Sequence, residues 1–584
     1  MSSPSLIERR REQMFPVLSP AQIAVARRFG GLPVTFERDA IVFEVGQADT
    51  PAYLVLSGSI VAARRDSLGD LRIVTTHTAG EVTGEIGQLS GGPSLARGRS
   101  GVDGAEAVPF NSTQLRALIV ATVDIGEMIM RAFILRRVFL IETGAGLVLL
   151  GSRVSADALR LENFLRRNAV PYTMLDPDSD TGAAHLIDRM AISKAELPLA
   201  ICPNGTILRR PREKALAQCL GLFPSSFDDR AYDVAIVGAG PAGLATAVYA
   251  ASEGLSVLAL DARAFGGQAG ASARIENYLG FPTGISGEAL AGRAFAQAQK
   301  FGAVMAIPAE VRLLKVVLAG VTQCGAPGFE LELNEGHPVH ATTVVIASGA
   351  RYRKPALPNL NSFEGRGVYY WASAIELKLC SRREVAVVGG GNSAGQGTVF
   401  LASDVARVHL LVRGRRLEDG MSQYLIDRIR ALPNVEVHTE TELTQLIGDP
   451  TEGLQAVCWR RGSTGMEERH AIQHVFLFIG ADPNTEWLRR CDVKVDDKGF
   501  VRTGDVHACP GGHRDEPQWQ ALPLETSLRG VFAVGDVRAG SIKRVASAVG
   551  DGATVAAQLH LYLRTIQPIM AAGAAVGTIR PARS

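Results

Sequence analysis

The segment from Tyr232 to Asp261 constrains the fold of this chain more than any other. It begins with a short apolar run at 233–237 that is typical of a buried parallel strand, passes through the turn Gly238-Ala239-Gly240-Pro241-Ala242-Gly243 and enters an alanine-rich helical pattern. A second apolar run, at 257–260, ends on Asp261. This order of strand, Gly-x-Gly-x-x-Gly turn, helix and acid is the dinucleotide-binding fingerprint. The alternative is a glycine-rich turn in another kind of α/β protein.

Each part of the fingerprint has a physical task. The first glycine permits a tight turn, the second lets the backbone approach a pyrophosphate, and the third lets the helix pack closely on the strand. The helix N-terminus offers free N–H groups to phosphates, and Asp261 can accept hydrogen bonds from ribose hydroxyls. The cofactor-binding residues predicted for this turn are Gly238, Gly240, Pro241, Ala242 and Gly243.

Length and composition limit the class of protein. A chain of 584 residues is too long for one core, so three or four domains are expected. With 46% hydrophobic residues, 21% charged residues and a net charge of +2, it reads as a soluble globular protein that binds neither nucleic acid nor a membrane. No signal peptide is evident and the apolar stretch 116–150 is interrupted by charges, so we expect a cytoplasmic protein. The seven cysteines are scattered without metal-ligand spacing, which favours structural thiols in a reducing compartment.

Residues 1–143 contain short β-like runs separated by glycines, which predict a small antiparallel barrel or jelly roll followed by a helix at about 124–141. The segments 53–60 and 84–90 resemble the hairpin and the phosphate-binding cassette of cyclic-nucleotide-binding domains. The resemblance implies that Glu85 holds a ribose and that an arginine pairs with the cyclic phosphate. Ser94 stands where that family usually has arginine, so Arg97 is the candidate. Either this shifted arginine serves, or the barrel is structural and binds no nucleotide.

Residues 146–223 read as a small α/β domain. Strands are expected at 147–150 and 172–176, a helix at 157–167, and a later hairpin turning at Asn204-Gly205. This order resembles a thioredoxin or glutaredoxin fold with Pro198 at the cis-proline position. The family's redox cysteines should follow the first strand, but residues 151–156 contain no thiol. We therefore expect a degenerate module, a spacer or docking surface that performs no thiol–disulfide exchange.

From Tyr232 to about residue 565 the chain resembles the low-molecular-weight thioredoxin reductase family. The linked motifs are Gly266-Gly267-Gln268, Ile275-Glu276-Asn277-Tyr278, a second fingerprint at 389–394 and a closing Gly535-Asp536. The resemblance implies a flavoprotein that binds FAD and NADPH. Members of that family are usually dimeric, so a homodimer is expected. The further cofactor-binding residues that it implies are Gly267, Gln268, Asn277, Gly389, Gly391, Asn392, Ser393, Ala394, Gly535, Asp536, Arg544 and Val545.

The ribose-contacting positions distinguish the two nucleotide sites. Asp261 suits the adenosine of FAD. The corresponding region of the second site has no acid and carries Arg413, Arg415 and Arg416, which favours a 2′-phosphate and hence NADPH over NADH. The alternative for these arginines is a solvated basic turn.

The chain departs from that family where electrons should leave the flavin. The family has Cys-Ala-Thr-Cys where residues 371–374 read Trp-Ala-Ser-Ala, so Trp371 and Ala374 occupy both redox positions and no catalytic residue is predicted. The nearest thiol, Cys380, is a single cysteine. A second departure is Lys543-Arg544-Val545, where the family has Arg-Gln-Ala, and the added charge is expected to raise the flavin potential or stabilise its anionic reduced form.

The sequence thus predicts a multidomain protein in five parts. These are a cyclic-nucleotide-binding-like domain (1–143), a degenerate thioredoxin-like domain (146–223), an FAD domain in two segments (230–353 and 484–565), an NADPH domain (354–483) and a flexible tail (566–584).

Three functions remain open. The first is an NADPH-dependent FAD oxidoreductase with a non-disulfide acceptor, such as an iron–sulfur protein, a quinone or dioxygen. The second is a thioredoxin-disulfide reductase that acts without an internal dithiol. The third is a sensor whose barrel binds a cyclic nucleotide and whose domain equilibrium follows that ligand or the redox state.

Overall fold

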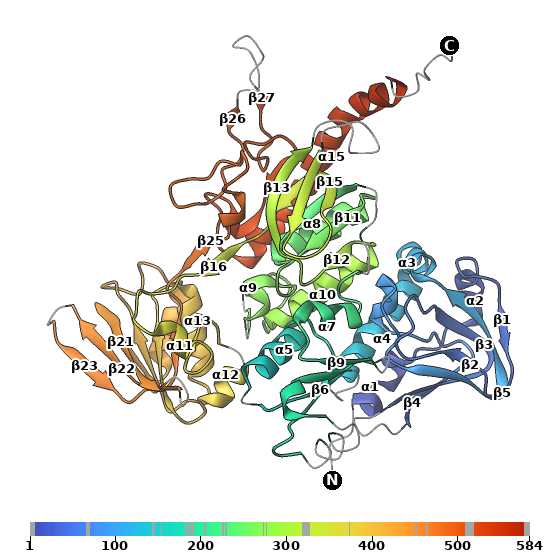
Figure 1. The fold of residues 1–584 in the computed structure, drawn as a ribbon, viewed down its shortest axis with the longest axis horizontal. Helices are drawn as coiled ribbons and strands as arrows, with labels where there is room; N and C mark the ends of the chain where they lie inside the picture. Colours follow the sequence, from blue (N-terminus) through green and yellow to red (C-terminus); the bar gives the residue numbers. More distant parts are fainter. Residues whose placement is uncertain are drawn as a thin grey trace.

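The structure is a computed structural model that describes most of the chain (Figure 1). The described residues are 6–65, 71–142, 147–153, 155–180, 183, 187, 192–203, 206–224, 227, 231–272, 274–275, 277–317, 328–372, 374–449, 453–462, 465–507 and 519–576. No helix within these ranges is long and apolar enough to cross a membrane.

The N-terminal domain is an antiparallel sheet with helices. Its strand order is β1-β5-β3-β4, with β2 paired to β5. Its strands are β1 (Val34–Phe36), β2 (Ile41–Phe43), β3 (Ala52–Arg65), β4 (Leu71–Thr78) and β5 (Arg97–Phe110), and its helices are α1 (Leu6–Met14), α2 (Pro20–Ala26), η1 (Ile86–Ser90), α3 (Ser112–Ala121) and α4 (Val123–Glu142). The expected helix at 124–141 is confirmed by α4, whereas a closed barrel stays a prediction.

One strand boundary in this domain was predicted wrongly. The hairpin-like segment 53–60 was expected to separate two short β-like runs at Gly58, but the chain continues through it as the single strand β3. Irregularities in its pairing with β5 bend the strand on either side of Gly58 without ending it. Gly58 has a φ of +69°, and a Cβ there would lie 2.2 Å from the Gly104 carbonyl oxygen, so the close approach of β3 and β5 requires glycine.

The small α/β module that follows has the sheet order β7-β6-β8-β9, in which β6 and β7 are parallel and the other pairs antiparallel. Its elements are β6 (Leu147–Leu150), α5 (Ala156–Arg167), β7 (Tyr172–Leu175), η2 (Lys194–Glu196), β8 (Leu199–Ile201), β9 (Ile207–Arg209) and α7 (Glu213–Cys219). These confirm the predicted strands and helix, and the peptide bond before Pro198 is cis. The turn expected at Asn204-Gly205 lies outside the described residues.

A disulfide in this module corrects the interpretation of the cysteines. Cys202 and Cys219 are bonded, so the expectation of unpaired structural thiols is wrong for these two. They are 17 residues apart in sequence, and the pairing depends on α7 folding back beside β8. No short spacing motif marks it.

The first dinucleotide domain contains the sheet β12-β11-β10-β15-β14-β13, with β28 paired to β15. Its strands are β10 (Tyr232–Val237), β11 (Val257–Leu260), β12 (Val304–Ala306), β13 (Val311–Val317), β14 (Gly328–Leu333), β15 (Val339–Ile346) and β28 (Val531–Ala533), and its helices are α8 (Pro241–Ser252), α9 (Gly267–Gly270), α10 (Gly287–Lys300), η3 (Glu486–Leu488), η4 (Gly535–Val537) and α15 (Val545–Val576). The strand, turn, helix and strand predicted at 232–261 are confirmed. β10 pairs with β11 and β15 in parallel, and its central residues are fully buried, which explains its continuous apolar sequence.

The second dinucleotide domain is a parallel sheet, β17-β24-β18-β19-β20, packed beside a three-stranded antiparallel sheet. The parallel sheet comprises β17 (Val368–Tyr369), β18 (Glu384–Val388), β19 (Arg407–Leu411), β20 (Val435–His438) and β24 (Val475–Leu477), the antiparallel sheet β21 (Thr441–Asp449), β22 (Gly453–Arg461) and β23 (Glu467–His470), and the helices α11 (Leu360–Phe363), α12 (Ala374–Leu379), α13 (Asn392–Leu401) and α14 (Gln423–Ala431). Two short antiparallel strands, β16 (Ala350–Tyr352) and β25 (Ala481–Pro483), connect this domain to the first one (Figure 1). A third pair is formed by β26 (Val506–His507) and β27 (Trp519–Gln520).

The predicted tail begins too early. Residues expected to be loosely ordered from 566 onward continue helix α15 as far as Val576. Residues 577–584 lie outside the described ranges.

The small module and the first dinucleotide domain share one hydrophobic core. Leu161 and Phe164 of α5 belong to the same buried cluster as Tyr232 and Val234 of β10. The N-terminal domain meets the same region, since η1 packs against α10. The first dinucleotide domain is therefore the centre to which the other parts attach (Figure 1).

Candidate cofactor and electron-transfer site

The turn between β10 and α8 needs glycine at two positions for packing alone. Gly238 has a φ of +113°, and a Cβ there would lie 2.2 Å from the Ala347 carbonyl oxygen. A Cβ on Gly243 would lie 1.8 Å from the Gly238 carbonyl oxygen. Neither contact is possible for a larger residue, so these glycines set the tight turn and the close approach of α8 to the sheet.

Gly240 has a different role because the space in front of it is open. A Cβ there would meet only the Gly267 Cα, at 3.9 Å. Gly240 is the N-cap of α8, no side chain caps the helix, and Pro241 occupies the first turn. The free N–H groups and the positive end of the helix dipole therefore face this open space, which fits the pyrophosphate of a dinucleotide.

Asp261 holds the turn in place. Its Oδ2 accepts the N–H of Ala239 at 2.8 Å, and its Oδ1 accepts those of Arg263 at 2.9 Å and Ala264 at 3.1 Å. Burial raises the pKa of this carboxyl, while the three N–H donors oppose the rise. A carboxylate has about four acceptor sites, so capacity remains for a ribose hydroxyl. The sequence predicted the ribose contact but not this structural task.

The segment containing Gly267, Gln268 and Asn277 lies against the same turn. A Cβ on Gly267 would lie 3.1 Å from the Gly240 Cα, and the Gln268 side-chain amide donates to the Ala350 carbonyl oxygen. Asn277 lines a cavity of about 390 Å³. Its other lining residues are Arg274, Pro282, Thr283 and Gly284 and, from the second dinucleotide domain, Tyr424.

The closing motif completes the first site from the opposite direction. A Cβ on Gly535 would lie 2.8 Å from the Ala242 Cβ, so this glycine packs directly on the start of α8. The Asp536 carboxylate is half-buried, which raises its pKa, and no hydrogen-bond donor among the described residues reaches it. An unsatisfied carboxylate at this position fits a cofactor that carries hydroxyl groups.

Charged side chains follow the closing motif. Lys543 Nζ donates to Ser541 Oγ at 2.7 Å and lies 4.3 Å from the centre of the Phe500 ring. Arg544 is exposed, and Val545 begins α15. Burial lowers the pKa of Lys543, with Asp536 opposing the change.

The second fingerprint repeats the same geometry. Gly389 has a φ of +146°, and a Cβ there would lie 2.3 Å from the Phe478 carbonyl oxygen, whereas a Cβ on Gly391 would meet only a carbonyl oxygen at 3.9 Å. Gly391 is the N-cap of α13, again without a side-chain cap. Ser393 is exposed in the first turn of α13, and Ala394 is buried beneath it. This open helix N-terminus fits a second pyrophosphate.

The side chain of Asn392, which was predicted to contact the cofactor, bonds to another part of its own domain. Its Oδ1 accepts the N–H of Ser422 at 2.7 Å, which ties α13 to the start of α14.

The three predicted arginines do not act as one group. Arg415 pairs with Glu440 at 3.0 Å and Arg416 with Glu418 at 3.7 Å. Arg413 is exposed and has no ion pair among the described residues. Of the three, Arg413 has the guanidinium that is available to a 2′-phosphate.

The segment at the redox positions has no thiol chemistry. Trp371 is half-buried, and its Nε1 donates to Glu376 Oε1 at 3.2 Å, while Ala374 begins α12. Cys380 is buried and its thiol donates to the Glu376 carbonyl oxygen at 2.8 Å. Burial raises the pKa of Cys380 to about 11, so the thiol is protonated and a poor nucleophile at neutral pH.

Two further free cysteines lie in the described part of the chain, and they do not form a disulfide with each other. Among the described residues, Cys458 is buried and Cys491 donates to the Leu488 carbonyl oxygen at 3.0 Å. Cys324 and Cys509 lie outside the described residues.

In the N-terminal cassette, the two residues predicted to hold a cyclic nucleotide have partners of their own. Glu85 accepts the N–H of Gly87 at 2.9 Å and lies 3.5 Å from Arg137. Arg97 pairs with Glu44 at 2.5 Å. No described contact joins Glu85 to Arg97, so their joint role stays a prediction.

The sequence did not reveal the residue that supports this cassette. Arg136 is buried and donates to the carbonyl oxygens of Met14, Val82 and Gly84 at 2.7, 2.9 and 2.7 Å. Burial lowers the pKa of its guanidinium to about 10, and it stays charged at neutral pH. Its only sequence signal is a charge inside an apolar helix, here α4.

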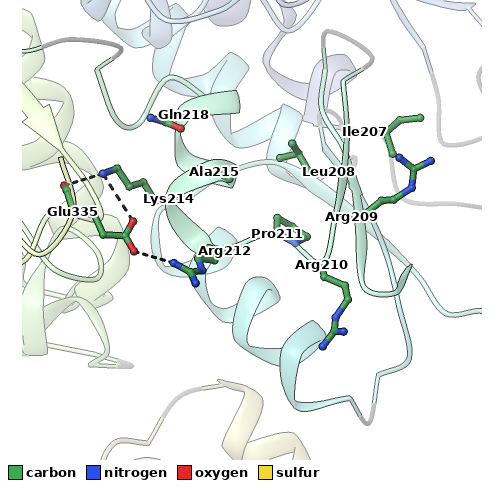
Figure 2. A pocket seen from close by; sticks show the side chains of 10 residues that line it. All are labelled: Ile207, Leu208, Arg209, Arg210, Pro211, Arg212, Lys214, Ala215, Gln218 and Glu335. Atoms are coloured by element: carbon green, nitrogen blue, oxygen red, sulfur yellow. Dashed lines mark hydrogen bonds and ion pairs between the residues drawn. The ribbon is translucent and has the colours of Figure 1, made fainter. Parts of the chain in front are cut away.

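A cavity of about 440 Å³ marks the contact between the small module and the first dinucleotide domain (Figure 2). Its rim carries Arg209, Arg210, Arg212 and Lys214. Glu335, from the other domain, pairs with Arg212 at 3.2 Å, and its carbonyl oxygen accepts from Lys214 at 2.8 Å. These contacts join the two domains and neutralise part of the basic rim.

Comparison with known proteins agrees with this geometry. The profile of the pyridine nucleotide-disulphide oxidoreductase family matches residues 232–552. Thioredoxin reductase of Treponema pallidum is 32% identical over 58% of this chain and 98% of its own length. The crystal structure of T. acidophilum thioredoxin reductase superimposes with a TM-score of 0.50 and 30% identity, covering 58% of this chain and 100% of that one.

One relative extends further along the chain. The NADH dehydrogenase of Bacillus subtilis is 30% identical over 70% of this chain and 73% of its own length. Residues 232–584 make up only about 60% of the chain, so this similarity reaches into the small α/β module.

The family match covers more than half of the chain and includes both fingerprints, the closing Gly535-Asp536 and the strands that carry them. The chain therefore belongs to the pyridine nucleotide-disulphide oxidoreductase family and is an NAD(P)H-dependent flavin oxidoreductase with FAD and NADPH as its cofactors.

Proposed function

We propose that this protein oxidises NADPH and passes the electrons through FAD to an acceptor that is not a disulfide. The observation that carries the proposal is the occupation of both redox positions by Trp371 and Ala374. The nearest thiol, Cys380, is protonated, buried and bonded to the backbone. Reducing equivalents on the flavin therefore have no internal disulfide to enter at this segment.

The residues of the chain bind and orient the two nucleotides. The N-terminus of α8 at Gly240 receives the FAD pyrophosphate, and Asp261 and Asp536 accept hydroxyl hydrogen bonds. The N-terminus of α13 at Gly391 receives the NADPH pyrophosphate, and Arg413 pairs with the 2′-phosphate. Bound flavin supplies the ability to take a hydride and release electrons to a different partner.

The cavity beside Asn277 supports a small organic acceptor such as a quinone. Its volume of about 390 Å³ lies in the range of small-molecule sites, and Tyr424 provides an aromatic wall from the second domain. The relative called NADH dehydrogenase also supports this choice, because that name describes nicotinamide oxidation without a disulfide. An iron–sulfur protein and dioxygen are the competing acceptors.

Anaerobic stopped-flow reduction tests the first half of the proposal. NADPH should bleach the oxidised-flavin band in a fast phase, and NADH should do so more slowly. If the flavin stays oxidised with both nucleotides, the proposal fails. Turnover with a soluble quinone, a ferredoxin-type protein, air and a thioredoxin disulfide, each supplied separately, then identifies the acceptor class.

Thioredoxin-disulfide reduction without an internal dithiol is the second candidate. It is favoured by the names of the relatives, such as the thioredoxin reductase of Treponema pallidum. It requires the acceptor disulfide to meet the flavin directly. NADPH oxidation that depends on thioredoxin, and that exceeds oxidation with the quinone, would establish it over the first candidate.

We also propose that the N-terminal domain modulates flavin reduction. The cassette segment 84–90, which carries Glu85, includes η1, and η1 packs on α10 of the first dinucleotide domain. A cyclic nucleotide bound at the cassette would have a direct contact through which to act. The proposal also includes the five-part domain division, in which residues 566–576 belong to α15. It further includes assembly of the chain as a homodimer.

A further inference from the structure

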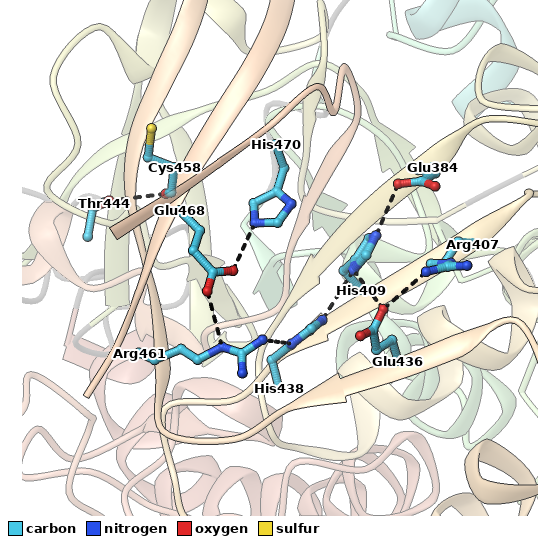
Figure 3. A network of polar contacts seen from close by, with 10 residues as sticks. All are labelled: Glu384, Arg407, His409, Glu436, His438, Thr444, Cys458, Arg461, Glu468 and His470. Carbon is cyan, nitrogen blue, oxygen red and sulfur yellow. Dashed lines mark hydrogen bonds and ion pairs between the residues drawn. The ribbon is translucent and has the colours of Figure 1, made fainter. Parts of the chain in front are cut away.

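Two imidazoles meet inside the second dinucleotide domain. His409 lies on β19 and His438 on the edge strand β20, and both are buried. His409 Nδ1 and His438 Nε2 are 3.1 Å apart (Figure 3). A carboxylate oxygen, Glu436 Oε2, lies 3.6 Å from His409 Nδ1. Three atoms of metal-ligating type therefore converge on one point.

The strand register explains the convergence. His409 and Glu436 are paired residues of the neighbouring strands β19 and β20. Glu436 and His438 are two residues apart, so their side chains leave the same face of β20. All three side chains thus project from one face, toward the antiparallel sheet that contains Trp459 and His470.

Aromatic residues enclose this point. Trp459 is fully buried, and its ring stacks on the His470 ring with centroids 3.6 Å apart. The Trp459 ring also lies 5.4 Å from His409 and 5.5 Å from His438. A well-packed apolar interior rarely contains imidazoles in contact. Apolar packing alone therefore does not explain why these histidines lie together.

The hydrogen-bond pattern assigns a donor or acceptor role to each ring nitrogen. Arg461 carries only donors and lies 3.5 Å from His438 Nδ1, so that nitrogen is the acceptor. His438 Nε2 then carries the proton and donates to His409 Nδ1. His409 Nε2 in turn donates to Glu384 Oε2 at 3.2 Å. In this arrangement each ring has one donor nitrogen and one acceptor nitrogen.

The spacing of the two ring nitrogens, which a hydrogen bond already accounts for, is also compatible with one shared transition ion. With metal–nitrogen bonds of about 2.0–2.1 Å, two imidazole nitrogens on a tetrahedral ion lie about 3.4 Å apart, and on a square-planar ion about 2.9 Å. The observed 3.1 Å lies between these values. The contact of His409 Nε2 with Glu384 supplies the carboxylate that commonly orients a metal-bound histidine.

We propose that His409, Glu436 and His438 bind one divalent transition ion of the Zn²⁺ type, through His409 Nδ1, His438 Nε2 and a Glu436 oxygen. The ion has three protein ligands and joins the edge strand β20 to its neighbour β19. Two imidazoles and one carboxylate favour a transition ion over Ca²⁺ and Mg²⁺, which prefer oxygen ligands.

Two existing contacts compete with the ion. Glu436 pairs with Arg407 at 3.4 Å, and Arg461 faces His438. On binding, the His438 proton moves from Nε2 to Nδ1, and Arg461 turns toward Glu468, which is 4.0 Å away. Arg461 therefore weakens metal binding.

The test uses the full chain after treatment with a chelator and titration with Zn²⁺ in a calorimeter. We expect one ion per chain, and Co²⁺ in its place should give visible d–d absorption typical of a site with imidazole ligands. His438→Gln should abolish binding, and Glu436→Gln should weaken it at least tenfold. Glu436 is half-exposed, so its variant should fold even if a histidine variant does not.

Two further variants sharpen the result. Arg461→Gln should bind Zn²⁺ more tightly than the wild type, because it removes a cation beside a ligand. His474→Gln replaces a buried histidine of the same domain that contacts Tyr369 and lies outside the ligand set, and should bind as the wild type does. The proposal is overturned if the wild type binds no Zn²⁺ stoichiometrically, or if Glu436→Gln and His438→Gln bind it unchanged.

Discussion

Ser90 and Gln299 join the N-terminal cassette to the flavin-binding domain. Gln299 Nε2, near the end of α10, donates to Ser90 Oγ, at the end of η1, over 3.1 Å. Two other contacts support η1 at this place. Arg116 of α3 donates to the Leu89 carbonyl oxygen at 2.5 Å, and Pro93 lies directly against Gly221, where a Cβ would be 2.5 Å from the proline ring.

The first prediction concerns this contact. If the cassette influences the flavin through η1, Gln299→Ala should remove the effect of a cyclic nucleotide on the rate of flavin reduction and leave the rate without ligand within about twofold, because an exposed hydrogen bond contributes only about 1 kcal/mol. Stopped-flow reduction at increasing cyclic AMP or cyclic GMP measures this. Gln297→Ala, on the same helix, is the control. A ligand effect that persists in Gln299→Ala would show that the contact does not transmit it.

The second prediction restores the missing dithiol. Trp371→Cys combined with Ala374→Cys should create a disulfide at the position where the thioredoxin reductase family has one. NADPH should then reduce it, and thiol titration after anaerobic reduction should find two more thiols per chain than in the wild type. The single variant Trp371→Cys should gain no NADPH-dependent thiol pair. An unchanged thiol count in the double variant would show that the reduced flavin does not reach residues 371–374 in this protein.

The third prediction separates the arginines of the nucleotide site. Arg413→Ala should raise the KM for NADPH about tenfold or more and leave the KM for NADH unchanged, since a charge-assisted hydrogen bond contributes about 1.5–3 kcal/mol. Arg415→Ala is the matched control, because Arg415 is paired with Glu440. Steady-state kinetics with both nucleotides measure the difference. Equal losses in the two variants would instead indicate a diffuse basic surface.

The fourth prediction is a pH dependence of stability. Burial lowers the pKa of His474 to about 4, below the ordinary value of 6.5. Between these values the unfolded chain binds a proton that the native imidazole does not, so the free energy of unfolding falls as the pH falls from about 6.5 toward 4. His474→Gln should lose less stability, by about 2 kcal/mol, between pH 7 and pH 5. Urea unfolding at both pH values tests the sign, and an equal or greater loss in the variant contradicts it.

The sequence by itself determined the parts that depend on local backbone chemistry. The two glycine-rich turns, their strands and helices, and the substitution of Trp371 and Ala374 are readable because each depends on residues close together in the chain. A glycine is required where a strand turns directly into a helix against another strand. The structure places Gly238 and Gly389 at such turns.

Only the tertiary structure decided which side chains are already engaged. Arg415 looks equivalent to Arg413 in sequence, but folding brings Glu440, 25 residues away, into an ion pair with it, whereas Arg416 pairs with Glu418 close by in the chain. The pairing of Cys202 with Cys219 and the meeting of His409 with His438 also depend on residues brought together by folding. Contacts of this kind are set by strand order and domain packing, which a local sequence pattern does not encode.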